Sequence, residues 1–136
     1  MAGEFFFSNS FLMLERSMNF QWTKQRATLD NIINAETPGY KAKYVTFEDA
    51  FRTQLLAAAA KGQSAGVMRN VVSTALPVVH TATPETARLD DNGVNVGEQL
   101  VEATRNTYQI QYVMDSMSSD LARLRTAIRG QYEVLT

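Results

Sequence analysis

The chain has 136 residues, of which 45% are hydrophobic, so it is long enough and apolar enough for one domain with a packed core. Its 13 basic and 14 acidic residues leave a net charge of −1 and are scattered along the chain, which disfavours nucleic acid as a partner. The absence of cysteine excludes disulfides and cysteine-ligated metals, and no apolar run approaches the roughly 18 residues of a membrane-spanning helix.

Residues 1–9 are expected to form an N-terminal extension. They include Phe5, Phe6 and Phe7, but no basic leader or convincing cleavage site accompanies them, so we expect no cleaved signal peptide. We interpret the three phenylalanines as a candidate partner contact, because they precede a helix at one end of the chain.

A helix is predicted over residues 10–36, because its apolar residues recur at steps of three, four or their multiples. Leu14, Met18 and Leu29 lie on its apolar face. At 1.5 Å per residue, this helix is expected to be about 40 Å long.

A turn is predicted to end this helix. Pro38 lacks a backbone donor and biases Thr37 toward an extended conformation, while Gly39 can adopt the positive φ required at the third position of a type II turn. The hinge motif comprises Asn31, Asn34, Ala35, Thr37, Pro38, Gly39 and Tyr40.

Residues 37–60 are predicted to contain this hinge and a short helix. Thr46 and Asp49 have the spacing of a capping box, and Phe47, Phe51 and Leu55 follow at four-residue intervals. Residues 61–94 are rich in small and polar residues and are predicted to form a long irregular loop with one or two short strands.

The last third carries the strongest periodicity, and a helix is predicted over residues 95–130, followed by a tail at 131–136. Asn95 can cap this helix, with Glu98 three positions later. Its apolar residues alternate steps of four and three, which is a heptad pattern. With Leu14, Met18 and Leu29, the predicted helix-packing seam comprises Leu100, Ile110, Met114, Met117, Leu121, Leu124 and Ile128.

These patterns predict an all-α single domain over residues 1–136, in which the long N- and C-terminal helices pack as an antiparallel, coiled-coil-like hairpin. The positions that flank the heptad seam carry few of the charge pairs that select a partner in an isolated coiled coil. The simplest partner of the C-terminal helix is therefore the chain's own N-terminal helix.

Catalytic chemistry is not expected. His80 is the sole histidine, and the sequence places no partners near it for a triad or a metal site. The run from Asp90 to Gly93 has the look of a calcium loop, but Val101 occupies the twelfth position where that loop needs glutamate. We therefore predict no catalytic residues, no metal and no cofactor.

The segment from Asn31 to Ala42 closely resembles the Asn-Ile-Ala-Asn-Ala-Asn-Thr-Pro-Gly-Tyr signature near the N-terminus of bacterial flagellar rod, hook and hook-associated proteins. Ile33 and Glu36 depart from that signature, but neither change removes the turn. The resemblance extends over residues 45–51 and 89–130, and the short chain with its ending from Leu121 to Gly130 resembles the proximal rod proteins.

The resemblance implies a structural subunit of the flagellar basal body, built into the periplasmic rod, that transmits torque and forms the wall of the export channel. Such proteins are exported unfolded by the flagellar type III system without a cleaved signal. The implied partners are rod proteins of the FlgC and FlgF types, the FliE adaptor, the export gate and other copies of the chain in a helical assembly. The alternatives are a rod protein of the FlgC type or another rod protein, and a small helical adaptor or chaperone of a secretion system.

Overall fold

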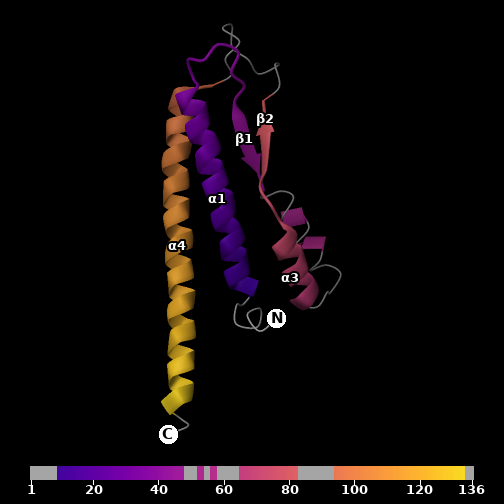
Figure 1. Ribbon diagram of the computed structural model, residues 1–136, viewed down its shortest axis with the longest axis vertical. Coiled ribbons are helices and arrows are strands. Elements are labelled where there is room, and N and C mark those ends of the chain that lie inside the picture. Colours follow the sequence, from indigo (N-terminus) through magenta and orange to yellow (C-terminus); the bar gives the residue numbers. More distant parts are fainter. Residues whose placement is uncertain (1–8, 48–51, 54–55, 58–64, 83–93, 134–136) are drawn as a thin grey trace.

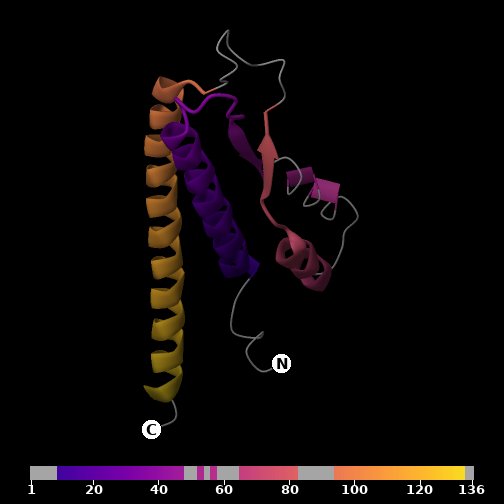
Figure 2. The same cartoon turned by 45° about the horizontal axis from the view of Figure 1, so that its top comes forward.

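The computed structural model describes residues 9–47, 52–53, 56–57, 65–82 and 94–133. The chain is mostly helical, with one two-stranded sheet. Its elements are α1 (Asn9–Ile33), β1 (Lys43–Thr46), α3 (Ala65–Thr74), β2 (Val78–Thr81) and α4 (Val96–Glu133). Figures 1 and 2 show α1 in the middle, with α4 along one side and the two strands and α3 along the other.

The two long helices lie side by side and run in opposite directions (Figure 1). The end of α1 meets the beginning of α4, where the Asn31 side-chain amide donates to Gln99 Oε1 at 2.9 Å. Further along, Lys24 forms an ion pair with Glu102. This arrangement is consistent with the hairpin predicted from the two periodic segments. None of the described helices combines the length and the apolar character needed to cross a membrane.

The ends of both helices follow from local hydrogen bonding. The Asn95 side-chain oxygen accepts from the backbone N–H groups of Gly97 and Glu98 at 3.1 and 3.4 Å, so Asn95 caps α4 as the sequence predicts. α1 ends at Ile33, three residues before the predicted boundary, and α4 continues to Glu133, three residues beyond it. Such differences are typical of frayed helix ends.

The region after the hinge differs from the prediction. Thr46 ends strand β1, and its hydroxyl pairs with His80 Nε2 at 2.7 Å, so it does not begin a helix. Phe47 is not helical either, residues 52–53 and 56–57 are helical, and the remaining residues of the predicted short helix lie outside the described residues. β1 pairs antiparallel with β2, with Tyr44 opposite His80 and Val45 opposite Val79.

Residues 61–94 contain β2, a short strand of the kind predicted there, but they also contain helix α3, so the prediction of a largely irregular loop is wrong. Weak helix formers such as Gly66 and Ser73 hide this helix in the sequence. Val72 is 1% exposed, and α3 packs on α1. Burial of this short apolar face therefore outweighs the weak intrinsic propensity of α3.

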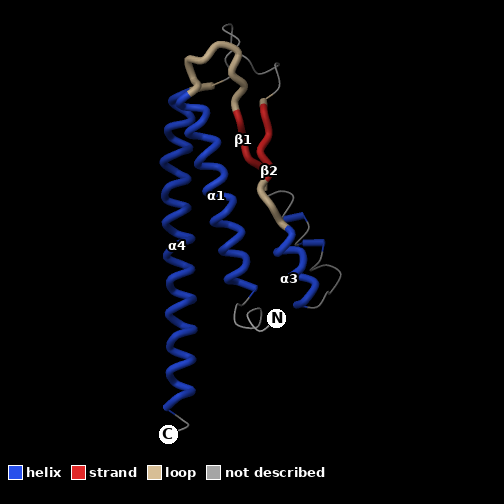
Figure 3. The backbone as a smooth tube through the Cα atoms, viewed as in Figure 1, coloured by secondary structure: helices blue, strands red, loops and turns tan. Residues whose placement is uncertain are grey.

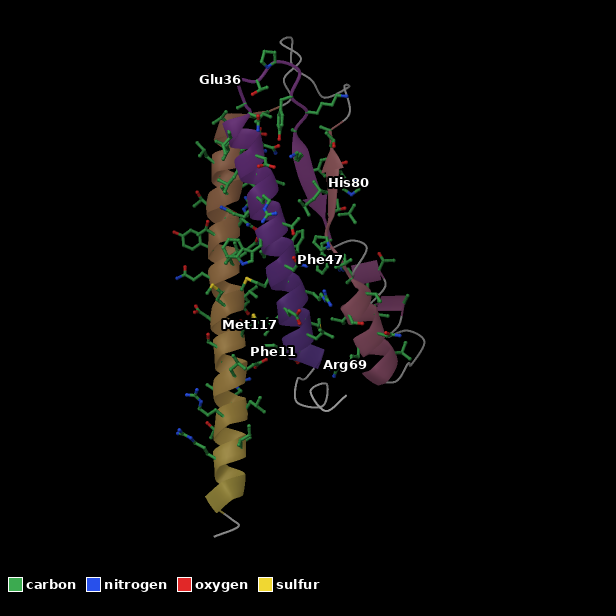
Figure 4. The ribbon with its side chains drawn as sticks, viewed as in Figure 1. Phe11, Glu36, Phe47, Arg69, His80 and Met117 are labelled. Atoms are coloured by element: carbon green, nitrogen blue, oxygen red, sulfur yellow. The ribbon has the colours of Figure 1, made fainter. Side chains whose placement is uncertain are left out.

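A small aromatic cluster forms the core between α1 and the strands. The rings of Phe20 and Phe47 stack with centroids 5.1 Å apart, Ala75 is buried with them, and Val45 packs against the group. Figure 4 shows Phe47 on the side of α1 that faces the strands and α3. This cluster joins α1 to the small sheet.

The buried line of the α1–α4 contact does not coincide with the predicted seam. On α4 it passes through Gln99, Asn106 and Val113, of which Asn106 is 0% exposed. On α1 the buried residues include Gln21 and Thr28. Seam residues that are intermediate in exposure are Leu14, Met18, Ile110, Met117 and Leu124, whereas Leu29, Leu100, Met114, Leu121 and Ile128 are exposed. Three of the five exposed seam residues, Leu29, Leu100 and Met114, directly follow a residue of the buried line in the sequence.

Val113 and Tyr112 form a matched pair for testing the packing of α4, because they are neighbours with opposite environments. Val113 is 6% exposed and Tyr112 is 74% exposed. We expect Val113→Asp to cost about 3 kcal/mol or more, because an unpaired carboxylate enters the helix contact. Tyr112→Asp is expected to change stability by less than about 1 kcal/mol. Thermal unfolding followed by circular dichroism measures both, and equal destabilisation of the two variants would contradict this packing.

Candidate functional site

The turn after α1 is built as the sequence suggests. Gly39 has a φ of 71°, and the Tyr40 N–H donates to the Thr37 carbonyl at 3.2 Å. These are the features of a type II turn with Pro38 at its second position. Figure 3 shows this loop leading from the end of α1 into β1. The turn therefore sends the chain back along α1.

Asn31 holds this reversal in place. Its side-chain oxygen accepts from the Lys43 N–H at 2.7 Å, and its side-chain nitrogen donates to the Lys43 carbonyl at 2.7 Å. The same nitrogen donates to Gln99, and the Tyr40 hydroxyl donates to the oxygen at 3.2 Å. Asn31 is 1% exposed, and its amide uses two donors and two acceptor positions, so it is fully satisfied. One buried amide therefore connects α1, β1 and α4.

A charged pair lies beside this amide. Lys43 Nζ lies 2.9 Å from the Asp30 carboxylate. That hydrogen bond raises the pKa of the Lys43 ammonium, and partial burial raises the pKa of the Tyr40 phenol against the opposing effect of Lys43. Because both groups hold their protons more tightly in the folded state, both are protonated at neutral pH, and the stability that these two groups contribute is lost as the pH rises above about 10. Tyr40 therefore reaches Asn31 as a neutral donor.

The remaining hinge residues complete the helix end. The Asn34 side chain donates to the Asp30 carbonyl at 2.8 Å, and the Asn34 carbonyl accepts from the Thr37 N–H at 2.9 Å. The Ala35 N–H donates to the Ile32 carbonyl at 3.3 Å. Asn34 thus satisfies backbone groups that the end of α1 leaves open.

A second polar site, at Asn106, was not predicted from the sequence. Asn106 Nδ2 donates to the Gln21 carbonyl and to Gln25 Oε1, both at 2.8 Å. Gln25 interrupts the apolar face of α1, and this interruption is the one sequence signal that indicates a polar partner. Among the described residues, four buried side-chain atoms have no hydrogen-bond partner, namely Arg16 Nε, Gln21 Oε1, Asn106 Oδ1 and Gln109 Oε1. The centre of the α1–α4 contact is therefore polar and incompletely satisfied.

His80 lies on β2, where its ring stacks on Tyr44 with centroids 5.1 Å apart (Figure 4). Its Nε2 is paired with Thr46 across the two strands. Within the described part of the chain, no three histidine, aspartate or glutamate side chains come together as a metal ion would require. The contacts of His80 are those of a residue that pairs two strands.

A groove of about 760 Å³ runs along α1 and is bordered by the strands. Trp22, Leu29 and Ile33 contribute apolar surface, while Lys43 and Val79 come from the strands. The groove is partly open, and the residues that line it bring together no acid, base and nucleophile. Of the predicted sites, the hinge is assembled, whereas Phe5, Phe6 and Phe7 lie outside the described residues.

Two flagellar proteins resemble the chain over almost all of its length. It is 24% identical over 129 residues to the flagellar basal body rod protein FlgB of Aeromonas hydrophila, an alignment that covers 92% of this chain and 96% of that protein. It is 26% identical over 126 residues to FlgB of Bacillus subtilis strain 168, covering 91% and 96%. No protein-family model matches the chain. The similarity supports a relationship to the FlgB rod proteins at low identity.

Asn31 and Asn19 provide a test of the buried amide. We expect Asn31→Ala to lower the free energy of unfolding by about 3 kcal/mol, because both backbone groups of Lys43 lose their partner inside the protein. Asn19→Ala, at an exposed position of the same helix, is expected to cost no more than about 0.5 kcal/mol. Urea unfolding of both variants provides the comparison, and similar midpoints would show that Asn31 does not hold the hinge.

Gly39 allows a test of the backbone conformation alone, since no atom lies within 4 Å of the position that a Cβ would occupy. We expect a cost of about 1 kcal/mol for Gly39→Ala and about 2 kcal/mol for Gly39→Val, with Gly39→Asn tolerated best because Asn adopts positive φ readily. Pro38→Ala should be milder than Gly39→Val. The order of the thermal midpoints checks this ranking, and a Gly39→Val variant as stable as the wild type would disprove it.

Proposed function

We propose that the chain is a structural subunit of the bacterial flagellar basal-body rod, of the FlgB type. The main support is the alignment with two FlgB proteins over at least 91% of this chain and 96% of theirs. The hinge motif provides a second argument, because Asn31 and the turn at Gly39 fix the chain reversal at the end of α1. The described residues form two long paired helices with exposed apolar surfaces, which suits a mechanical part.

A rod subunit must carry load along its length. α4 has 38 residues and is therefore about 57 Å long, and α1 lies beside its first two thirds. Backbone hydrogen bonds within the helices run along this axis, and the hinge closes one end of the pair. In the proposed role, these paired helices transmit torque and contribute to the wall of the export channel.

Assembly supplies the contacts that a single chain leaves open. The exposed seam residues of α4, together with Tyr108 and Tyr112, are available to neighbouring subunits. We propose rod proteins of the FlgC and FlgF types, the FliE adaptor, the export gate and other copies of this chain as the neighbours. Phe5, Phe6 and Phe7 remain a proposed contact to one of them. The proposed location is the periplasmic rod, reached through the flagellar type III system without a cleaved signal.

Deletion of the gene in its own bacterium tests this function. We expect the deletion strain to be non-motile and to lack rods in detergent-extracted basal bodies, because a subunit of a continuous structure cannot be omitted. Wild-type basal bodies should contain the chain, as measured by mass spectrometry.

Complementation with the wild-type gene is the control. Intact rods in the deletion strain would refute the proposal. A chain found only in a closed cytoplasmic complex with one other protein would instead identify a secretion chaperone or adaptor.

A further inference from the structure

The α1–α4 pair has an apolar flank that the chain leaves open. On α1, Gln21 and Thr28 are buried while the following residues, Trp22 and Leu29, are exposed. The same relation holds on α4, where buried Asn106 and Val113 are followed by Thr107 and Met114. In an α-helix, each residue points about 100° away from the residue before it. Because the two helices are antiparallel, the residue that follows a buried one points to the same side of the pair on both helices. The exposed stripes therefore form one continuous surface.

This open flank, defined by Trp22, Leu29, Ile33, Leu100 and Met114, is more apolar than the helix contact beside it. Trp22 is 57% exposed, Ile33 77% and Leu100 53%. The centre of the contact, by comparison, holds amides such as Asn106. Covering side chains of this size on binding is favourable, because each contributes apolar area that leaves water. The flank thus has the character of an interface.

A groove along α1 shares Trp22, Leu29 and Ile33 with this flank. It extends from Asn19 to Ile33, with Lys43 and Val79 of the strands along one side. At 1.5 Å per residue its floor is about 21 Å long. A helix laid along α1 would therefore fit for about four turns.

A helical segment of matching length projects from the other end of the same chain. Following the register of the Asn31–Gln99 and Lys24–Glu102 contacts, Asn9 lies level with about Ser119. The part of α4 from Leu121 to Glu133 extends beyond the described part of α1 by about 20 Å (Figure 1). We refer to this part as the α4 overhang.

The α4 overhang carries its own apolar face. Leu121, Leu124 and Ile128 follow at steps of three and four residues, so they lie on one side of the helix. Leu121 and Ile128 are each 46% exposed. Arg125 and Arg129 lie beside this face and remain able to reach solvent. An exposed apolar face with arginines beside it is typical of a helix that packs on another helix.

We propose that the α4 overhang of one copy occupies the α1 groove of a second copy. The overhang points away from the hinge, whereas the groove lies at the hinge end, so copies in the same orientation can engage when displaced along their long axis. Leu124 is about 40 Å from the level of Ile33 in its own chain, so one molecule cannot satisfy both surfaces. The contact joins two different surfaces, which generates an open assembly.

This inference rests on the proposed rod function and names one partner of the subunit, namely another copy. The contact also has a defined direction. The beginning of the overhang should lie near Ile33 and its tip toward Trp22, because α4 of the upper copy runs antiparallel to α1 of the lower copy. Leu124 is then expected close to Leu29.

Cross-linking of the purified full-length chain tests this contact, and the natural absence of cysteine makes the background clean. We would introduce Leu29→Cys and Leu124→Cys together and treat the protein with a short bismaleimide. The expected result is a ladder of dimers, trimers and higher species on a denaturing gel. Each single variant alone should give at least tenfold less cross-linked product, while a mixture of the two single variants should give dimers only.

Asp115→Cys combined with Leu124→Cys is the matched control, because Asp115 is exposed on another face of α4. It should give no ladder, and circular dichroism should show the same helix content for all variants. No ladder from the first double variant at any concentration up to its solubility limit would overturn the inference, as would dimers from a single variant, which indicate a symmetric contact. Cross-linking in isolated basal bodies to a different rod protein alone would likewise overturn the second copy as the occupant.

The two proposals fail separately. If deletion of the gene removes the rod but no ladder forms, the rod function stands and the self-contact is wrong. If the ladder forms but the deletion strain keeps its rods, the chain self-associates and the rod function is wrong.

Discussion

The amide of Asn31 is the interaction on which the rest of the arrangement depends. It offers the Lys43 backbone a donor and an acceptor in the geometry that a neighbouring strand would supply. The strand that begins at Lys43 can therefore lie against α1, although a helix offers no free backbone groups with which a strand could pair. The remaining capacity of the amide goes to Tyr40 and Gln99, so the turn, β1 and α4 share one fixed point. Loss of this point would leave several buried polar groups without partners at once.

The helix pair combines a polar centre with an apolar flank. Asn106, Gln21 and Gln25 occupy positions where a stable two-helix contact would ordinarily place leucine or isoleucine. A buried amide at such a position lowers stability but defines register, because a shift along the helix would bury its polar atoms against carbon. Apolar side chains that could have stabilised the isolated pair, such as Leu100 and Met114, are exposed beside the contact instead of buried in it. The pair therefore suits a subunit whose full stability comes from its neighbours.

The sequence predicts the local features of the fold well. The Pro38–Gly39 turn follows from the conformational limits of two residues, and the cap at Asn95 follows from the chemistry of one side chain. Both depend on residues close in sequence. The two long helices also follow from periodicity, because a helix-length pattern is repeated many times in each.

The errors have a common physical origin in contacts between distant residues. Heptad spacing identifies stripes on α4 but does not select between two adjacent stripes. We expected the more apolar one, with Leu100 and Met114, to be buried, whereas the structure buries the stripe with Asn106 and Val113. β1 and α3 were missed for the same reason. Asn31 recruits Lys43 into a strand, and Phe20 lies in the cluster beside which α3 packs, and neither partner is visible in the local sequence.

The contacts of Asn31 also differ in the length of the chain segment between the two residues that each contact joins. Lys43 is 12 residues away, whereas Gln99 is 68 residues away. Loop-closure entropy grows with the logarithm of that separation, which makes the second closure about 1.5 kcal/mol more costly than the first. The hinge and β1 can thus form around Asn31 while α4 is still unstructured. Once they have formed, the amide is already oriented, and α4 binds to a polar surface that no longer has to be ordered.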